Sequence, residues 1–198
     1  MKTVQFKGRS RIFRLMLVFL VMGGLASLNS RAEAQEYKAV GGSSIKVNGT
    51  SNLHNWIMQA GSFSAEAQLS LKGDKVSDIT SLTFSLPVQN LKAKEDLMNT
   101  RAYKAMKADK YPTITFKLTG ADVNQSAVKA TGTLTIAGVS KAVQLQGKVV
   151  ENSDGTVTIT GSRGIKMSEY GITPPTFMLG ALKVGDEVTV EFALKLKK

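Results

Sequence analysis

The chain of 198 residues contains no cysteine, one histidine (His54) and one tryptophan (Trp56). The absence of cysteine excludes disulfide bonds and zinc sites built on thiolates. A single histidine also excludes a metal site that needs several imidazoles. We therefore expect no bound metal and no covalently attached cofactor.

The sequence also lacks the short motifs of common enzyme classes. It has no Gly-x-Ser-x-Gly nucleophile elbow, no phosphate-binding P-loop and no dinucleotide fingerprint. We expect a protein that is not an enzyme and has no catalytic residue. Its aromatic residues alternate with polar residues instead of interleaving with a basic face, so we expect no nucleic-acid binding.

No uncharged apolar run reaches the roughly 20 residues that span a bilayer as a helix. The longest, 15–28, follows five basic residues and precedes Ala32 and Ala34, which place small side chains at the −3 and −1 positions of a cleavage site. This three-part pattern predicts a signal peptide over 1–34 and a mature domain over 35–198. No cysteine stands at the junction, which excludes a lipoprotein, so we expect a periplasmic or secreted domain. Loss of six basic residues and one acidic residue lowers the formal net charge from +11 to +6.

Alternation of apolar and polar residues dominates the chain from Ser43 onward. A period of two predicts strands that have one apolar face. About eight such strands, separated by turns, are typical of a sandwich or a barrel. Eight antiparallel strands can close into a barrel that side chains fill or that holds one small ligand. We predict an all-β, eight-stranded antiparallel barrel.

One short insertion, 92–110, breaks the alternation. Its apolar residues Met98, Ala102, Ala105 and Met106 recur at the spacing of one helix face. Pro112 ends the segment, because the residue before a proline is disfavoured in helical geometry. We predict one short helical insertion. Its basic residues suit an anionic head group or a membrane surface, although charge runs more often form a solvated helix face.

Many small residues lie on the apolar faces of the predicted strands. A filled interior normally needs larger side chains at such positions. The alanines, such as Ala65 and Ala67, favour a hollow interior, or lumen. The glycines allow either a lumen or bulges and bends in the strands.

Four stretches, in order along the chain, resemble the YceI-like family of exported, lipocalin-like barrels that bind polyisoprenoid lipids. They are 49–56, which reads Gly-Thr-Ser-Asn-Leu-His-Asn-Trp, 96–101 with 107–116, 132–141, and 164–172 with 184–192. The resemblance spans 37–198. It implies a lipocalin-like fold, an isoprenoid ligand such as a quinone or prenyl phosphate, and no catalytic residue.

The predicted site has two parts. We expect the lumen to be lined by Val47, Trp56, Phe63, Ala65, Ala67, Phe84, Met98, Met106, Phe116, Leu134 and Phe192. We expect Arg101 to bind a head group, because its guanidinium can grip a phosphate. His54 is the second head-group candidate, although a lone histidine in a corner more often bonds nearby backbone.

These residues predict an exported lipid-binding protein that transports or stores an isoprenoid chain. Its expected partners are an isoprenoid lipid or quinone and, transiently, a membrane; a homodimer is possible. One alternative is a stress-related structural or interaction barrel with a filled interior and no lipid. A hydrolase or isomerase that uses His54 is a third.

Overall fold

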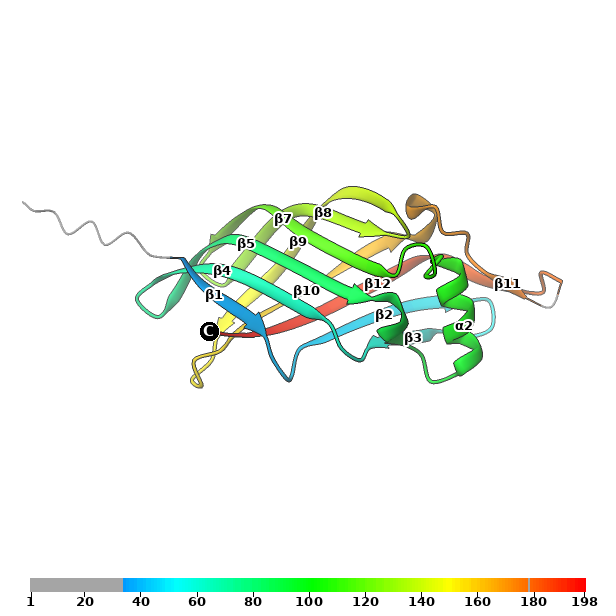
Figure 1. Ribbon diagram of the computed structural model, residues 1–198, viewed down its shortest axis with the longest axis horizontal. Helices are drawn as coiled ribbons and strands as arrows, with labels where there is room; N and C mark the ends of the chain where they lie inside the picture. The colour runs from blue at the N-terminus through cyan, green and yellow to red at the C-terminus, as the bar shows by residue number, and fades with distance from the viewer. Residues whose placement is uncertain (1–33, 178) are drawn as a thin grey trace, which may run out of the picture. The chain divides into compact units, whose positions relative to one another are not determined.

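The computed structural model describes residues 34–177 and 179–198. The predicted signal peptide lies outside these residues except for Ala34, so it stays a prediction. The described chain is almost entirely antiparallel β-sheet with one α-helix, α2 (Asp96–Ala105) (Figure 1). No helix in this part of the chain has the length and apolar character needed to cross a membrane.

The strands alternate apolar and polar residues, as the sequence predicted. In chain order they are β1 (Ala34–Ala39), β2 (Ser44–Ser51), β3 (Trp56–Ala60), β4 (Ser64–Lys72), β5 (Lys75–Pro87), β6 (Leu91–Lys92), β7 (Thr113–Asn124), β8 (Ala127–Ile136), β9 (Val139–Glu151), β10 (Val157–Lys166), β11 (Thr176–Phe177) and β12 (Leu182–Lys197). Two short 3₁₀ helices, η1 (Val88–Asn90) and η2 (Met167–Tyr170), follow β5 and β10.

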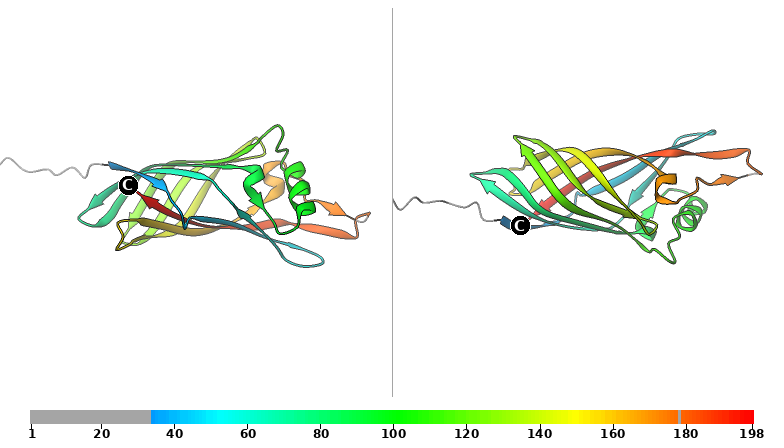
Figure 2. Two further views of the ribbon diagram at one scale, coloured as in Figure 1. Left: turned by 60° about the horizontal axis from the view of Figure 1, so that its bottom comes forward. Right: turned by 90° about the horizontal axis from the view of Figure 1, so that it is seen from above.

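Eight of the strands form a closed ring in the order β1-β4-β5-β7-β8-β9-β10-β12. Antiparallel pairing of β1 with the end of β12, through Lys38 with Lys197 and Ala39 with Leu196, closes it. The predicted eight-stranded antiparallel barrel is therefore confirmed (Figures 1 and 2).

The long strand β12 changes partner along its length. Near its end it pairs with β1, whereas from Val184 to Ala193 it pairs with β2. β2 pairs with β3, and β3 pairs with β6, which follows β5 through η1. The wall near α2 is thus continued by β2 and β3, while β1 and β4 complete the ring at the opposite end.

The helix α2 is fixed to the end of the barrel formed by β3 and β6. The Tyr103 hydroxyl donates to the carbonyls of Gln89 and Leu91, at 2.9 and 3.0 Å. Asn99 receives the backbone N–H of Ala93 at 2.6 Å on its Oδ1 atom. The predicted helical insertion is confirmed, although the helix is shorter than the segment 92–110 because β6 and these loop contacts occupy its start.

The end of the barrel near the C-terminus, which we call the packed end, is filled by side chains. Leu69, Val149 and Leu196 are at most 1% exposed there, and Tyr37 of β1 adds its ring to the same core. Burying one such aliphatic side chain stabilises the fold by about 1.5–3 kcal/mol. The core therefore anchors the barrel at the end away from α2.

Candidate functional site

The barrel is hollow from the end next to α2 as far as the side chains that cover the packed end. It contains a cavity of about 520 Å³, within the usual range for pockets that enclose a small molecule. Apart from a few polar groups, its walls are apolar side chains of β2, β3, β5–β12, α2 and η2. The exposed residues His54, Leu97 and Arg101 belong to the lining, so the cavity reaches solvent at this end, which we call the mouth.

Most of the predicted lumen residues lie in the wall of this cavity. They are Val47, Trp56, Phe84, Met98, Met106, Phe116, Leu134 and Phe192. They come from six different strands, α2 and the turn that follows it. The structure thus brings together residues that are far apart in the sequence around one apolar space.

Three predicted lumen residues lie elsewhere, and this corrects the expected lining. Ala65 and Ala67 belong to β4, which contributes no residue to the cavity wall, and they are 3% and 2% exposed. Ala67 pairs with Tyr37 and with Leu82, so its methyl group is covered within the core. Phe63 precedes β4 and packs on Phe84, with ring centroids 5.4 Å apart.

Aromatic rings that form part of the cavity wall pack directly over the inward glycines. Gly49 pairs with Trp56, and Gly161 pairs with Phe192. A Cβ atom at either glycine would lie 2.5 Å or less from the ring of its partner, and Gly132 has the same relation to Phe116. Each glycine therefore leaves room for a ring to pack against the neighbouring strand. This role differs from both expected roles, which were to enlarge the lumen or to permit a bulge.

The predicted face of α2 covers the mouth. Met98, Ala102, Ala105 and Met106 all line the cavity. Methionine side chains are flexible and fill irregular spaces well. The helix therefore presents an adaptable apolar surface to whatever occupies the cavity.

Arg101 lies at the mouth and bridges two elements. Its guanidinium carbon is 3.9 Å from the centroid of the Phe177 ring in β11. Such cation–π stacking contributes about 0.5–1 kcal/mol at an exposed position. The contact links α2 to the β11–β12 hairpin, and the edges of the guanidinium stay available for hydrogen bonds.

His54 lies in the exposed turn between β2 and β3. Its Nδ1 atom is 2.8 Å from the carbonyl oxygen of Asn55. The neighbouring Trp56 donates from Nε1 to the Thr50 carbonyl at 3.0 Å, and Ser51 donates from its hydroxyl to the His54 carbonyl at 2.8 Å. The histidine lines the mouth, but one ring nitrogen is already engaged with backbone, as the less specific interpretation expected.

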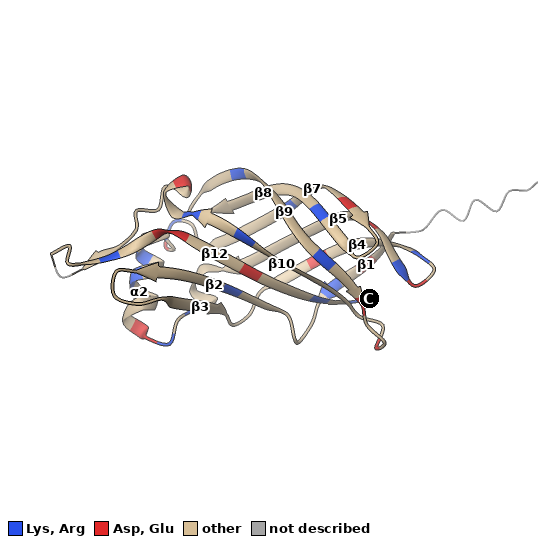
Figure 3. Cartoon of the chain, turned by 180° about the vertical axis from the view of Figure 1, so that it is seen from behind, with Lys and Arg blue, Asp and Glu red and all other residues tan. Residues whose placement is uncertain are grey.

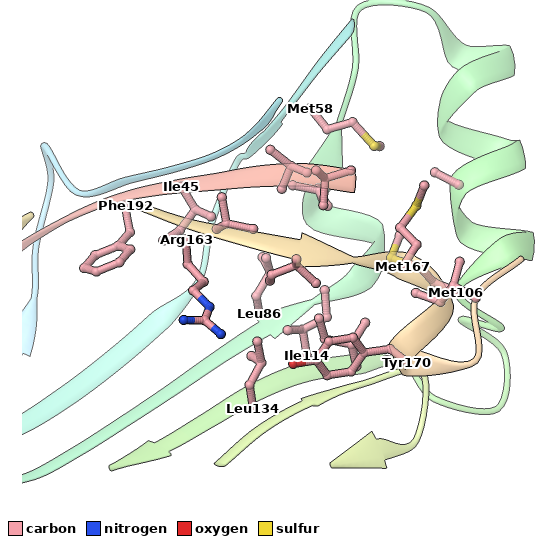
Figure 4. Close-up of a pocket in the computed structure, with 18 of the residues that line it drawn as sticks. Ile45, Met58, Leu86, Met106, Ile114, Leu134, Arg163, Met167, Tyr170 and Phe192 are labelled. Atoms are coloured by element: carbon pink, nitrogen blue, oxygen red, sulfur yellow. The ribbon is translucent and has the colours of Figure 1, made fainter. Parts of the chain in front are cut away.

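Several polar residues of the cavity lining were missed in the sequence, and two of them matter most for the site. Arg163 of β10 and Tyr170 of η2 both line the cavity (Figure 4). Arg163 lies on the same face of β10 as Ile159 and Ile165, which also line the cavity, so its position in the strand was the available signal. Burial of Tyr170 raises the pKa of its hydroxyl, Glu169 raises it further, and the charge of Arg163 opposes the shift.

Across residues 34–177 and 179–198, no three or more histidine, cysteine, aspartate or glutamate side chains are grouped to hold a metal ion. The chemistry that the cavity offers is therefore apolar contact, with hydrogen bonding at a few points. Such a lining is suited to a hydrophobic molecule that carries a small polar group.

Comparisons with known proteins agree with this geometry. The family model for the YceI-like domain matches residues 34–196. The crystal structure of BcnA from Burkholderia cenocepacia aligns with a TM-score of 0.66 at 21% identity, over 79% of this chain and 96% of that one. A polyisoprenoid-binding domain from Saccharophagus degradans, described as implicated in plant cell wall breakdown, aligns with a TM-score of 0.63 at 14% identity, over 83% and 99%.

The YceI protein of Campylobacter jejuni aligns with a TM-score of 0.55 at 22% identity, covering 68% of this chain and 81% of that one. At these identities the solved structures establish a shared fold. No curated protein sequence matches the chain significantly. The family model nevertheless spans nearly the whole barrel, and the chain belongs to the YceI-like domain family.

Proposed function

We propose that this chain is an exported lipid-binding protein that holds an isoprenoid tail in its cavity, for transport or storage. The observation that carries the proposal is the apolar cavity of about 520 Å³, closed by the packed end and open at the mouth. The export signal and a periplasmic or secreted location rest on the sequence pattern of 1–34.

The choice of an isoprenoid ligand draws support from the family. The Saccharophagus degradans relative is described as a polyisoprenoid-binding domain. We extend that ligand class, a quinone or a prenyl phosphate, to this chain because its cavity wall is apolar along the strands and adaptable at the methionines.

The hydrophobic effect sets the scale of binding. Removal of one five-carbon isoprene unit from water is favourable by up to about 4 kcal/mol, at about 0.8 kcal/mol per carbon. Such a lipid resides in a bilayer, where its tail is already out of water. Net affinity therefore depends on fit and polar contacts, and function depends on exchange with the membrane.

The mouth carries features suited to that exchange. Leu53, Ile57 and Leu97 are 70%, 56% and 60% exposed, and Leu179 is fully exposed. Asn52 holds the β2–β3 turn to the β11–β12 hairpin, since its Nδ2 atom donates to the Ala181 carbonyl at 2.7 Å. This bond joins the turn that carries Leu53 to the hairpin that carries Leu179, and Leu97 lines the cavity at its mouth. We call Leu53, Leu97 and Leu179 the mouth rim.

Basic residues accompany the mouth rim. Lysine and arginine side chains occur on α2, on the segments that flank it and on β12 (Figure 3). They are Lys92, Lys94, Arg101, Lys104, Lys107, Lys110 and Lys183. Near an anionic bilayer each cation adds about 1 kcal/mol of attraction. We propose that the mouth rim makes the transient membrane contact through which lipid enters and leaves.

Lipid uptake tests the proposal. Delipidated mature protein is mixed with a long-chain prenyl phosphate or quinone, and the soluble complex is separated from free lipid by gel filtration. We expect about one lipid to co-elute with each barrel. Absence of lipid from the protein peak for both classes would favour the alternative of a structural or interaction barrel.

A further inference from the structure

Arg163 projects into the cavity, whose walls are mostly apolar. It lies in β10 opposite Val190 of β12, and Figure 4 shows its guanidinium pointing into the cavity, toward Leu86 of β5 and Leu134 of β8. Most of its surroundings in this view are aliphatic or methionine side chains. A guanidinium stays charged at any physiological pH, so this position places a permanent cation inside the barrel.

The contacts of Arg163 leave most of its donors free. Nη1 donates to the backbone carbonyl of Gln144 at 2.9 Å, beyond the last β9–β10 pair, Gln146 with Ser162. In the described part of the chain, Arg163 makes no ion pair with an acidic side chain. Among the described residues that line the cavity, the one acidic side chain is Glu95, beside α2 at the mouth.

Tyr170 adds a second donor to the same space. It is 2% exposed, and its hydroxyl end is turned toward the part of the cavity that Arg163 enters (Figure 4). No residue in 34–177 or 179–198 accepts a hydrogen bond from this hydroxyl. Burial raises its pKa, so the phenol is protonated near neutral pH and can donate.

We propose that Arg163 and Tyr170 form an inner site for the polar head of the lipid, which binds acceptor oxygens and prefers an oxyanion such as a phosphate or carboxylate. The head group then lies inside the barrel. The tail occupies the space toward α2, which Met58, Met106 and Met167 line (Figure 4). This inference rests on the proposed function. It adds to that function by assigning the head group to Arg163 in place of Arg101.

Physical reasons favour the inner arginine over the mouth arginine. Both side chains are exposed to solvent, but the face of the Arg101 guanidinium is occupied by Phe177, whereas Arg163 points into the cavity among aliphatic side chains (Figure 4). Charge interactions are weak in water and strengthen where surrounding groups are apolar. A hydrogen bond to a charged group is accordingly worth more within the cavity than at its rim.

The test uses two probes that share one tail, geranylgeranyl phosphate and geranylgeraniol. Fluorescence of Trp56, the only tryptophan and a cavity residue, reports their binding. We expect Arg163→Met to weaken phosphate binding by about tenfold or more and alcohol binding by less than about threefold. Tyr170→Phe should weaken phosphate binding by a smaller factor, and the control Arg101→Met should change it by less than about threefold.

Retained geranylgeraniol binding shows that each variant still forms the cavity, and Arg163→Lys supplies a second variant that keeps the charge. We expect Arg163→Lys to bind the phosphate with an affinity between those of the wild type and Arg163→Met. An unchanged phosphate-to-alcohol ratio in Arg163→Met, or a larger loss in Arg101→Met, would overturn the inner site and leave the proposed function intact. Failure of the wild type to bind either probe would overturn both.

Discussion

Replacement of two inward alanines by phenylalanine should change stability in opposite directions. Ala130 of β8 lines the cavity, whereas Ala67 of β4 is 2% exposed within the packed end. Both alanines lie on the inward face of a strand. They differ in that Ala130 borders the cavity and Ala67 does not. The pair therefore tests whether the barrel is hollow where the structure places the void.

The expected magnitudes follow from burial and crowding. A buried phenylalanine side chain gains about 1.5–3 kcal/mol, and the methyl group of Ala130 already accounts for part of this. We expect Ala130→Phe to raise the free energy of unfolding by about 1–2 kcal/mol. Overpacking a filled core costs about 1–3 kcal/mol, so we expect Ala67→Phe to lower it by that amount.

Thermal unfolding and lipid uptake measure the two effects. In a domain of this size 1 kcal/mol corresponds to about 2–4 °C in Tm. Ala130→Phe should therefore melt higher and take up less prenyl phosphate. Ala67→Phe should melt lower and take up lipid normally. If Ala130→Phe melts lower than the wild type by as much as Ala67→Phe, the interior near Ala130 is filled and the reasoning fails.

Three further predictions concern the mouth, the packed end and the cavity wall. Leu53→Glu combined with Leu97→Glu should reduce co-sedimentation with anionic vesicles severalfold. The control Val150→Glu, at an exposed apolar position on β9, should not reduce it. Equal losses in both variants would refute a membrane contact specific to the mouth. Hydrogen bonds from Thr156 and Lys195 lower the pKa of Asp154, so its stabilising contribution is complete above the unfolded pKa of about 3.9 and is lost as pH falls through the lower folded value. Asp154→Asn should therefore reduce the acid dependence of Tm below about pH 4, and an unchanged profile would contradict this assignment. Gly161→Val should displace the Phe192 ring and lower stability by about 1–3 kcal/mol, measured by urea unfolding; a neutral result would contradict the close glycine–aromatic contact.

The strands and the ring were predictable because their signal is local. Alternation assigns each residue to a face, and strongly alternating segments such as 128–136 and 188–196 became β8 and part of β12. The helix face of Met98 and Ala102 followed from spacing in the same way. Local periodicity therefore yielded the fold and much of the cavity lining.

The position of each inward residue along the barrel axis was not predictable, because it depends on the register between strands that are distant in the sequence. Ala65 and Ala67 pair with Phe84 and Leu82, which line the cavity, yet β4 itself contributes no residue to the cavity wall. The pairing of Gly161 with Phe192 likewise joins strands distant in sequence. The sequence of one strand shows on which face a residue lies, but it does not show which residue of the adjacent strand lies beside it.

Arg163 was missed for a different reason. The alternation of β10 places it on the inward face, where it lines the cavity while its side chain stays exposed to solvent, and it was not among the candidate residues predicted from the sequence. A charged residue in phase with apolar neighbours is a useful signal of a polar point inside a cavity, because burial of an unpaired charge is costly without a ligand or water.

Native mass spectrometry of the mature protein purified from its own host tests the central claim most directly. The account predicts a species heavier than the polypeptide by the mass of one isoprenoid lipid, which is lost on denaturation. A bare polypeptide mass, both as purified and after incubation with vesicles that contain quinone and prenyl phosphate, would contradict it.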